Sequence, residues 1–203
     1  MQSPMARDLW KLEEAFAAKG YHAICGVDEA GAGPLAGRVY AAAVMLPFGL
    51  ELPYLNDSKK VTEKRREVLF DLICEKSICW SVAWASEGEV DEINILNARM
   101  LAMERAICGL SPKADFALID GNRNAGISVA NEMVVKGDEQ SASIAAASIL
   151  AKVSRDHYML SMAQEYPGYA FEKHKGYPTK LHYELLREHG PSAIHRKTFL
   201  KKL

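Results

Sequence analysis

Four acidic side chains follow apolar, strand-like segments, and acids placed in this way could hold divalent metal ions. Asp28 and Glu29 follow one such segment, Asp120 follows a second and Asp138 a third. If the segments are neighbouring strands, their ends converge, and four carboxylates would repel one another unless cations neutralised them. Hard divalent cations prefer oxygen ligands, and two ions about 3.5–4 Å apart can activate a water and stabilise the leaving oxygen of a phosphodiester. The pattern favours a metal-dependent phosphoesterase, with solvated loop acids as an equal alternative.

These acids need a sheet to bring them together, and the hydrophobic pattern predicts one. Apolar runs predict strands, a glycine-rich turn joins the first two, and apolar positions at steps of three and four predict helices. Interleaved strands and helices with one tight turn between neighbouring strands indicate an α/β fold with a mixed sheet. The predicted strands are 21–27, 38–46, 80–85, 116–119 and 132–136, and the predicted helices are 1–20, one capped by Thr62, 90–110, 141–152 and 179–188.

The predicted helix over 141–152 differs from the others because Ala and Ser dominate it. Small side chains leave little between a helix and its neighbour, so the backbone of this helix could approach a sheet very closely. We therefore expect this helix to pack directly against the sheet that carries the acids.

Length and composition indicate one globular domain. The chain has 203 residues, of which 49% are hydrophobic and 25% charged, and these values disfavour disordered, collagen-like and disulfide-rich classes. No apolar run reaches the roughly 20 residues of a membrane span, and the first residues lack the pattern of a signal peptide. The four cysteines form no C-x-x-C pair, which indicates reduced thiols. We expect a cytoplasmic protein.

The net charge of −1 hides a basic C-terminal region. From residue 171 to 203, eight Lys and Arg stand against three acids, and four of the six histidines lie there. A basic region beside an acidic metal site suits a polyanionic substrate, with a solvated basic tail as an equal alternative. We interpret residues 1–203 as a single domain whose helical, basic part, from about residue 157 to 203, contributes to substrate binding.

Seven sequence blocks, running in order from residue 26 to 179, closely resemble the motifs of the ribonuclease HII family. They cover most of the chain, so a chance match is negligible. The blocks are Gly26-Val27-Asp28-Glu29-Ala30-Gly31-Ala32-Gly33-Pro34-Leu35-Ala36-Gly37, Asn56-Asp57-Ser58-Lys59-Lys60, Ile93-Asn94-Ile95-Leu96, Ile119-Asp120-Gly121-Asn122, Lys136-Gly137-Asp138, 143–156 and His174-Lys175-Gly176-Tyr177-Pro178-Thr179.

The resemblance implies a ribonuclease H-like fold and an endoribonuclease that cuts the RNA strand of RNA–DNA hybrids. It also implies cleavage 5′ of ribonucleotides embedded in duplex DNA, with Mg²⁺ or Mn²⁺ as the cofactor and 5′-phosphate and 3′-hydroxyl ends. It assigns metal binding to Asp28, Glu29 and Asp120, and makes Asp138 the fourth catalytic carboxylate. Asp156 lies in a matching block but is not one of these four. We expect a monomer.

The resemblance also implies residues that contact the substrate. Tyr177 corresponds to a tyrosine that stacks on the sugar at the RNA-to-DNA junction, and the turn is expected to read the 2′-hydroxyl largely through its backbone. The predicted substrate-binding residues are Gly31, Ala32, Gly33, Lys59 and Tyr177.

One residue of the turn departs from the family pattern. Ala32 stands where an arginine is usual in the family, so the turn lacks a cation and we expect it to bind phosphate more weakly. Arg38, where proline is common in the family, is a candidate for a compensating charge.

Two other classes of protein fit parts of the sequence. Gly31-x-Gly33-x-x-Ala36 satisfies a relaxed dinucleotide-binding fingerprint, but in that class the glycines open a helix, and two acids would lie beside the pyrophosphate. A non-catalytic hybrid-binding module would suit the basic C-terminal region but leaves the acids unexplained. We regard both alternatives as disfavoured.

Overall fold

The protein is built around one five-stranded mixed sheet, as predicted. The computed structural model describes residues 9–53, 55 and 61–200. Strand β1 pairs antiparallel with β2 and parallel with β4, while β2–β3 is antiparallel and β4–β5 is parallel. The order across the sheet is β3-β2-β1-β4-β5. The strands are β1 (Ile24–Ala30), β2 (Val39–Met45), β3 (Cys79–Ala85), β4 (Phe116–Asp120) and β5 (Ala130–Val134).

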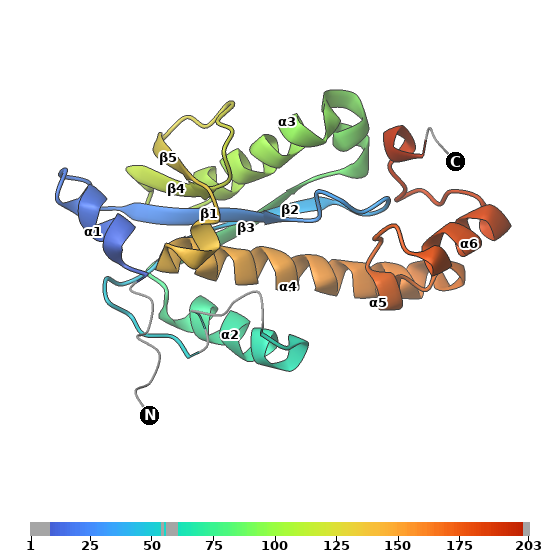
Figure 1. Cartoon of the computed structure of the whole chain (residues 1–203), viewed down its shortest axis with the longest axis horizontal. Helices are drawn as coiled ribbons and strands as arrows, with labels where there is room; N and C mark the ends of the chain where they lie inside the picture. Colours follow the sequence, from blue (N-terminus) through green and yellow to red (C-terminus); the bar gives the residue numbers. More distant parts are fainter. Residues whose placement is uncertain (1–8, 54, 56–60, 201–203) are drawn as a thin grey trace.

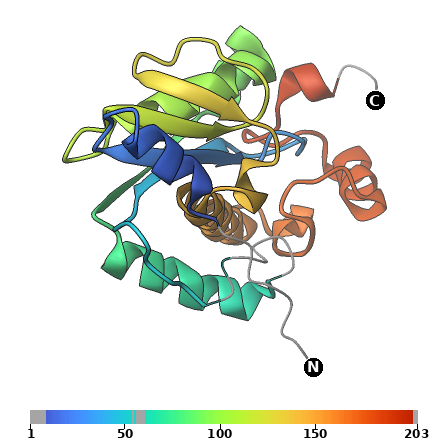
Figure 2. The ribbon, with the colours of Figure 1, turned by 60° about the vertical axis from the view of Figure 1, so that its left-hand side comes forward.

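Helices cover both faces of the sheet. Helix α4 (Ala142–Glu165) lies along one face with α2 (Glu63–Lys76) beyond it, and α3 (Glu87–Cys108) lies on the other (Figures 1 and 2). Alternate residues of β2 enter the two resulting cores: Ala42 packs in the α4 cluster and Ala43 in the α3 cluster. The period of two in a strand explains this division, because successive side chains point to opposite faces.

The Ala- and Ser-rich helix does pack directly on the sheet. An ideal Cβ built on Gly26 of β1 would lie 2.0 Å from the carbonyl carbon of Ser143 in α4. Only glycine fits this contact, so the two backbones touch. The Ser141 hydroxyl caps the helix by accepting a hydrogen bond from Ile144 N, and it donates to buried Glu13 of α1 (Lys11–Ala17).

The C-terminal region consists of short helices that pack at the far end of α4 (Figure 1). Helix α4 runs through residue 157, so the predicted boundary of this region falls inside that helix. A small core that includes Met159, Tyr169 and Phe171 joins the region to α4. The elements are η3 (Pro167–Tyr169), α5 (Phe171–His174), α6 (Lys180–His189) and η4 (Lys197–Phe199).

Several predicted boundaries were wrong. Strand β1 continues to Ala30, three residues beyond the predicted end, because it pairs with β2 over that length. Strand β5 lies two residues earlier than predicted, so Asp138 stands in the 3₁₀ turn η2 (Gly137–Glu139). Helix α3 contains a kink at Asn94, which has φ 66° and caps the following turns through its side chain. In the described part of the chain, no helix is long and apolar enough to cross a membrane.

Candidate active site

Parallel pairing brings the acids to one edge of the sheet. Val27 of β1 pairs with Ile119 of β4, so Asp28 and Asp120 are the next residues along two adjacent strands. Asp120 in turn pairs with Val134, the last residue of β5. The carboxyl ends of β1, β4 and β5 therefore meet, as the sequence predicted, although Asp28 and Glu29 lie inside β1 rather than after it.

Asp28 is a buried acid on β1, the central strand of the sheet. Its side chain is 7% exposed. Burial raises its pKa well above the ordinary value, and the nearby Glu29 and Asp120 carboxylates raise it further, while a hydrogen bond from Ser148 of α4 acts in the opposite direction. Burial and like charges disfavour the ionised form of a carboxyl, and a nearby cation would favour it.

Glu29, the next residue along β1, points toward the other face of the sheet, where it forms an ion pair with Arg99 of α3. Burial raises the pKa of Glu29, Arg99 lowers it, and Asp120 raises it again. The second carboxylate oxygen of Glu29, Oε2, is buried and accepts no hydrogen bond from the described residues. A buried oxygen without a donor is costly, and a cation could satisfy it.

Asp120 and Asp138 are joined through the turn η2. Asp120 Oδ1 accepts a 2.6 Å hydrogen bond from the backbone N–H of Gly137, the residue before Asp138. The Asp138 side chain is 3% exposed, because η2 packs against α4 and β4. An ideal Cβ on Gly137 would lie 2.5 Å from Ile144 Cδ1, so glycine lets the turn approach α4. Arg99 and Asp120 both line a neighbouring pocket of about 200 Å³.

The carboxylates are close neighbours, but they are directed toward different partners. Glu29 faces Arg99, whereas Asp120 faces the N–H of Gly137. Accordingly, no group of three or more His, Cys, Asp or Glu in the described part of the chain is already arranged around a metal-sized point. The mutual effects on the pKa values of Asp28 and Glu29 nevertheless place these acids within electrostatic reach of Asp120.

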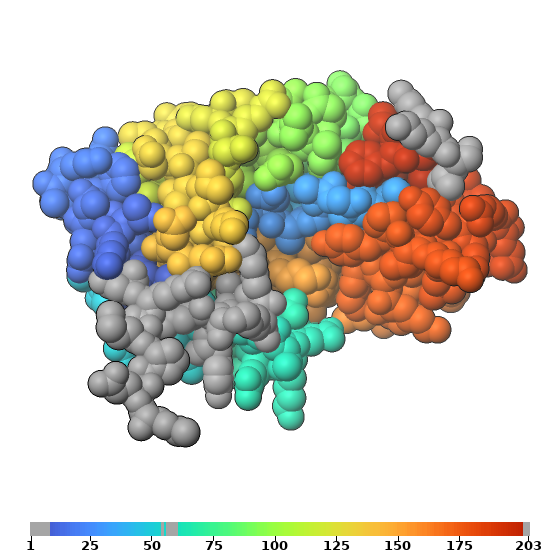
Figure 3. Space-filling view, viewed as in Figure 1, coloured from blue at the N-terminus to red at the C-terminus, as the bar shows by residue number. Residues whose placement is uncertain are grey.

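The described substrate-binding candidates lie close to one another, although they come from segments that are far apart in the sequence. The turn 31–37 leaves β1 and leads into β2, and Gly33 at its tip is exposed. A Cβ on Gly33 would lie 3.9 Å from the ring of Tyr177, which is 41% exposed. Leu35 N donates to Gly176 O, so the turn and the Tyr177 loop are bonded together. Figure 3 shows blue residues of the β1–β2 region at the surface between the gold segment near η2 and the orange-to-red C-terminal region. Lys59 lies outside the described residues.

The structure of the turn 31–37 is inconsistent with the dinucleotide-binding alternative. Its glycines are followed by β2, which runs antiparallel to β1, and not by a helix. The phosphate-binding helix N-terminus that defines that class is therefore missing at this position.

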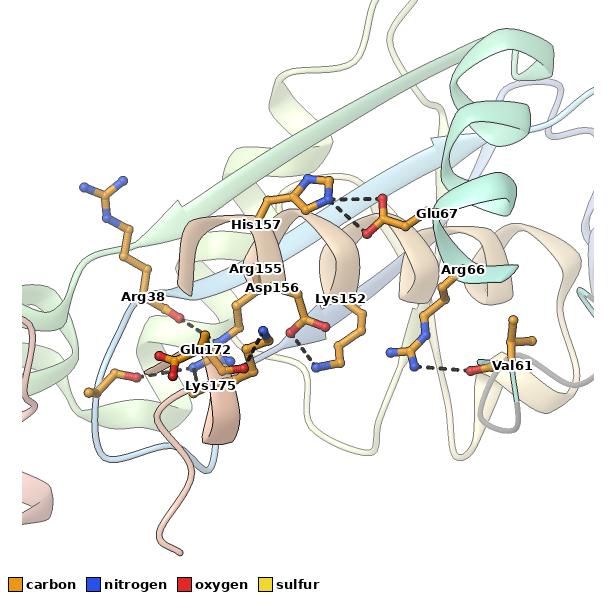
Figure 4. Close-up of polar contacts among 11 residues, drawn as sticks. Arg38, Val61, Arg66, Glu67, Lys152, Arg155, Asp156, His157, Glu172 and Lys175 are labelled. Carbon is orange, nitrogen blue, oxygen red and sulfur yellow. Dashed lines mark hydrogen bonds and ion pairs between the residues drawn. The ribbon is translucent and has the colours of Figure 1, made fainter. Parts of the chain in front are cut away.

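Arg38, the candidate for a compensating charge, places its guanidinium against two aromatic rings. Its guanidinium packs 4.8 Å from the ring centroid of Tyr158 and 5.1 Å from that of Trp84. The carbonyl oxygen of Arg38 accepts a hydrogen bond from Arg155 Nε. Figure 4 shows the Arg38 side chain directed away from that oxygen.

Part of the basic C-terminal region is buried. Arg196 is fully buried, and His174, His182 and His195 are buried as well. Burial lowers the pKa of each of these histidines, that of His195 to about 4, so they are neutral at pH 7. The surface of this region is therefore less basic than its composition indicates.

Sequence reasoning missed two arginines, and it interpreted Asp156 as a supporting acid. Arg99 occupies a position within the apolar stripe of α3, three residues after Leu96, and a charge inside such a stripe is the signal that could have identified it. The buried Arg155 carried no comparable signal. Asp156 pairs with Lys152 at 2.6 Å on α4 (Figure 4), which agrees with a supporting acid outside the site.

Solved structures define the class of the protein. Ribonuclease H2 from Pyrococcus horikoshii OT3 superposes with a TM-score of 0.71 at 24% identity, covering 87% of this chain and 93% of that chain. Bst-RNase HIII in complex with Mn²⁺ gives a TM-score of 0.59 at 15% identity, covering 83% and 63%. At these identities the likeness concerns the fold, and the chain has the ribonuclease H-like fold.

Sequence comparisons then give the family. The model of the family described as Ribonuclease HII matches residues 25–202. Ribonuclease HII of Endomicrobium trichonymphae is 52% identical over 196 residues, which are 96% of this chain and 93% of that protein. The chain belongs to the ribonuclease HII family, and it is a metal-dependent endoribonuclease that acts on RNA–DNA hybrids.

Proposed function

We propose that Asp28, Glu29 and Asp120 hold Mg²⁺ or Mn²⁺, with Asp138 as the fourth catalytic carboxylate. The chain then cuts on the 5′ side of ribonucleotides, in duplex DNA as well as in hybrids, and leaves 3′-hydroxyl and 5′-phosphate ends. The observation that carries this proposal is the meeting of these acids at the carboxyl edge of β1, β4 and β5, where Glu29 and Asp120 raise the pKa of Asp28, and Asp120 also raises that of Glu29.

The donor set fits a hard divalent cation. All four groups offer carboxylate oxygen, and Glu29 Oε2 is buried without a hydrogen-bond donor among the described residues. Turning Glu29 away from Arg99 and Asp120 away from Gly137 would release further oxygens. When bound, the metal supplies activation of water and stabilisation of charge at the phosphate. That Bst-RNase HIII is described with Mn²⁺ supports the choice of metals.

The substrate contacts come from two adjacent loops. The backbone of Gly31, Ala32 and Gly33 would read the 2′-hydroxyl, and Tyr177 would stack on the neighbouring sugar. Gly33 supports this role because it is exposed and lies beside the Tyr177 ring. Lys59 would contribute a phosphate contact.

We also propose that the chain acts as a monomer in the cytoplasm, and that the helical region from about residue 157 onward belongs to the same domain. The core that joins Met159 of α4 to Tyr169 and Phe171 supports the single domain.

The test is cleavage of three duplexes, one with a single ribonucleotide in DNA, one RNA–DNA hybrid and one all-DNA, each with Mg²⁺, Mn²⁺ or a chelator. We expect cuts 5′ of the ribonucleotide and none with the chelator. Asp120→Asn should lower the rate roughly 10²–10³-fold, the size typical for loss of a group that stabilises reacting charge.

Asp156→Asn is the matched control, because it removes an acid that pairs with Lys152 on α4 outside the proposed site. Its rate should stay within about twofold of the parent chain, about 0.4 kcal/mol, because Asp156 is not one of the four proposed carboxylates. Cleavage that persists with the chelator, or an Asp120→Asn variant as active as Asp156→Asn, would contradict the proposal.

A further inference from the structure

Arg196 is fully buried, and its guanidinium donates hydrogen bonds to carbonyl oxygens of the turn 31–37. Nη2 donates to Gly31 O at 2.7 Å, and Nη1 donates to Ala32 O at 3.2 Å and to Pro34 O at 2.9 Å. Nε and Nη2 donate to Gly37 O at 2.9 and 2.6 Å. One side chain thus binds four carbonyls of a seven-residue turn.

This arrangement fixes which side of the turn faces outward. The carbonyls point inward to Arg196, and Arg196 N donates to Leu35 O as well. Among the described residues, the N–H groups of Ala32 and Gly33 donate to no protein acceptor. A turn held by its carbonyls presents its N–H groups to a ligand, in the manner of backbone anion-binding sites.

Arg196 remains a cation in this position. Burial and the neighbouring Arg155 lower its pKa to about 10, so it is protonated at pH 7. Hydrogen bonds from a charged donor are stronger than neutral ones, and leaving such carbonyls unpaired in the interior would be costly.

The preceding residue, His195, connects the same segment to the second substrate loop. His195 Nδ1 accepts from Ser192 N at 2.9 Å, so its proton lies on Nε2. Nε2 then donates to His182 Nε2 at 3.1 Å, and His182 Nδ1 donates to the carbonyl oxygen of Tyr177 at 2.9 Å. Each neutral imidazole has one donor and one acceptor, and this chain uses both on each ring.

We infer that His195 and Arg196 are positioning residues that hold the 31–37 turn and Tyr177 in register with each other for a ribonucleotide. The inference rests on the proposed function, because it assumes that these two loops contact the substrate. Neither residue touches the reacting atoms. Their effect is to fix two elements, far apart in sequence, through one short C-terminal segment.

The experiment measures preference for a ribonucleotide. Dissociation constants are determined for a duplex with one ribonucleotide and for the all-DNA duplex, in an Asp120→Asn background that prevents cleavage, for the parent and for Arg196→Lys. Lysine keeps the charge but has three donors instead of the planar fork. We expect the preference to fall about tenfold, or about 1.4 kcal/mol, with binding of all-DNA duplex little changed.

Leu186→Ala is the matched control, since Leu186 is buried in the same C-terminal core and donates nothing to the turn. It should lower stability and leave the preference as it is. His195→Asn is the second variant, because it keeps an acceptor for Ser192 and loses the donor to His182. It should also reduce the preference, and thermal unfolding establishes that each variant is folded.

The outcomes separate the inference from the function on which it rests. If the parent shows no preference for the ribonucleotide, the proposed role of the two loops fails. If the parent discriminates and folded Arg196→Lys and His195→Asn discriminate equally well, the positioning role is overturned. The positioning role is also overturned if Leu186→Ala loses as much preference as these two variants do.

Discussion

His195 makes the stability of the protein depend on pH in a window that can be calculated. Its side chain is 2% exposed, and burial, together with His182, lowers its pKa from 6.5 to about 4. Between these two values the unfolded chain binds the proton and the folded chain does not. Stability is therefore fully present above about pH 6.5 and is lost as the pH falls toward 4.

The magnitude follows from the shift. Lowering the pKa from 6.5 to about 4 corresponds to about 3 kcal/mol in full. About 2 kcal/mol of this is lost between pH 7 and pH 5. Protonation is costly because Ser192 N–H donates to Nδ1, and a second proton on the ring would leave two donors facing each other.

The assay is urea unfolding followed by circular dichroism at pH 7, 6 and 5, at constant ionic strength with a chelator, for the parent and His195→Asn. The variant starts less stable at pH 7 by about 1 kcal/mol, the worth of a lost hydrogen bond. It should then lose about 2 kcal/mol less than the parent on going to pH 5.

Titrating groups that do not contact His195 cancel in this comparison. The raised pKa values of Asp28 and Glu29 act with the opposite sign, because carboxyls of this kind favour the folded state as the pH falls. The pKa of Glu89 is lowered to about 2, so its contribution is lost only below about pH 4.5. If the parent and His195→Asn lose the same free energy between pH 7 and 5, the reasoning about His195 is wrong.

Three further predictions concern the site and its support. Arg99→Met removes the ion-pair partner of Glu29, so the affinity for Mn²⁺, measured by calorimetry, should rise about three- to tenfold, or about 0.7–1.4 kcal/mol. Weaker binding would show that Arg99 instead holds Glu29 in place for the metal. Gly26→Ala places a methyl group against the Ser143 backbone and should lower the free energy of unfolding by about 3 kcal/mol, whereas unchanged urea unfolding would rule out the close contact. Ala32→Arg should tighten binding of a duplex with one ribonucleotide and steepen its salt dependence by about one unit of log–log slope, and an affinity unchanged at every salt concentration would exclude a phosphate contact there.

The sequence predicted the convergence of the acids better than it predicted their surroundings. Apolar runs before Asp28, Asp120 and Asp138 are local signals, and parallel strands bring their ends together whatever their exact limits. The limits themselves depend on pairing between distant segments. Strand β1 extends to Ala30 because β2 lies opposite it, and no local pattern encodes that length.

The sequence was least informative about buried polar groups. Composition counts Arg196 and His195 toward the basic region 171–203, because it does not distinguish a charge in water from one bonded to carbonyls. Neither residue lies in a periodic element that would reveal its face. Arg99 is different, since its place in the stripe of α3 could have indicated a partner on the sheet.

The substitution at Ala32 takes on a different meaning once Arg196 is considered. Because Ala32 replaces the usual arginine, the turn lacks a cation on its exposed side. Arg196 places a cation on the buried side of the turn, where it is hydrogen-bonded to Ala32 O among others. Such a buried charge cannot form an ion pair with phosphate, but it polarises the peptide groups that it binds, and their N–H ends become better donors. If the turn binds the substrate as proposed, its recognition would depend on backbone dipoles more than on a side chain. This favours a ligand group that accepts a directed hydrogen bond, such as the 2′-hydroxyl oxygen, over one recognised mainly by its charge.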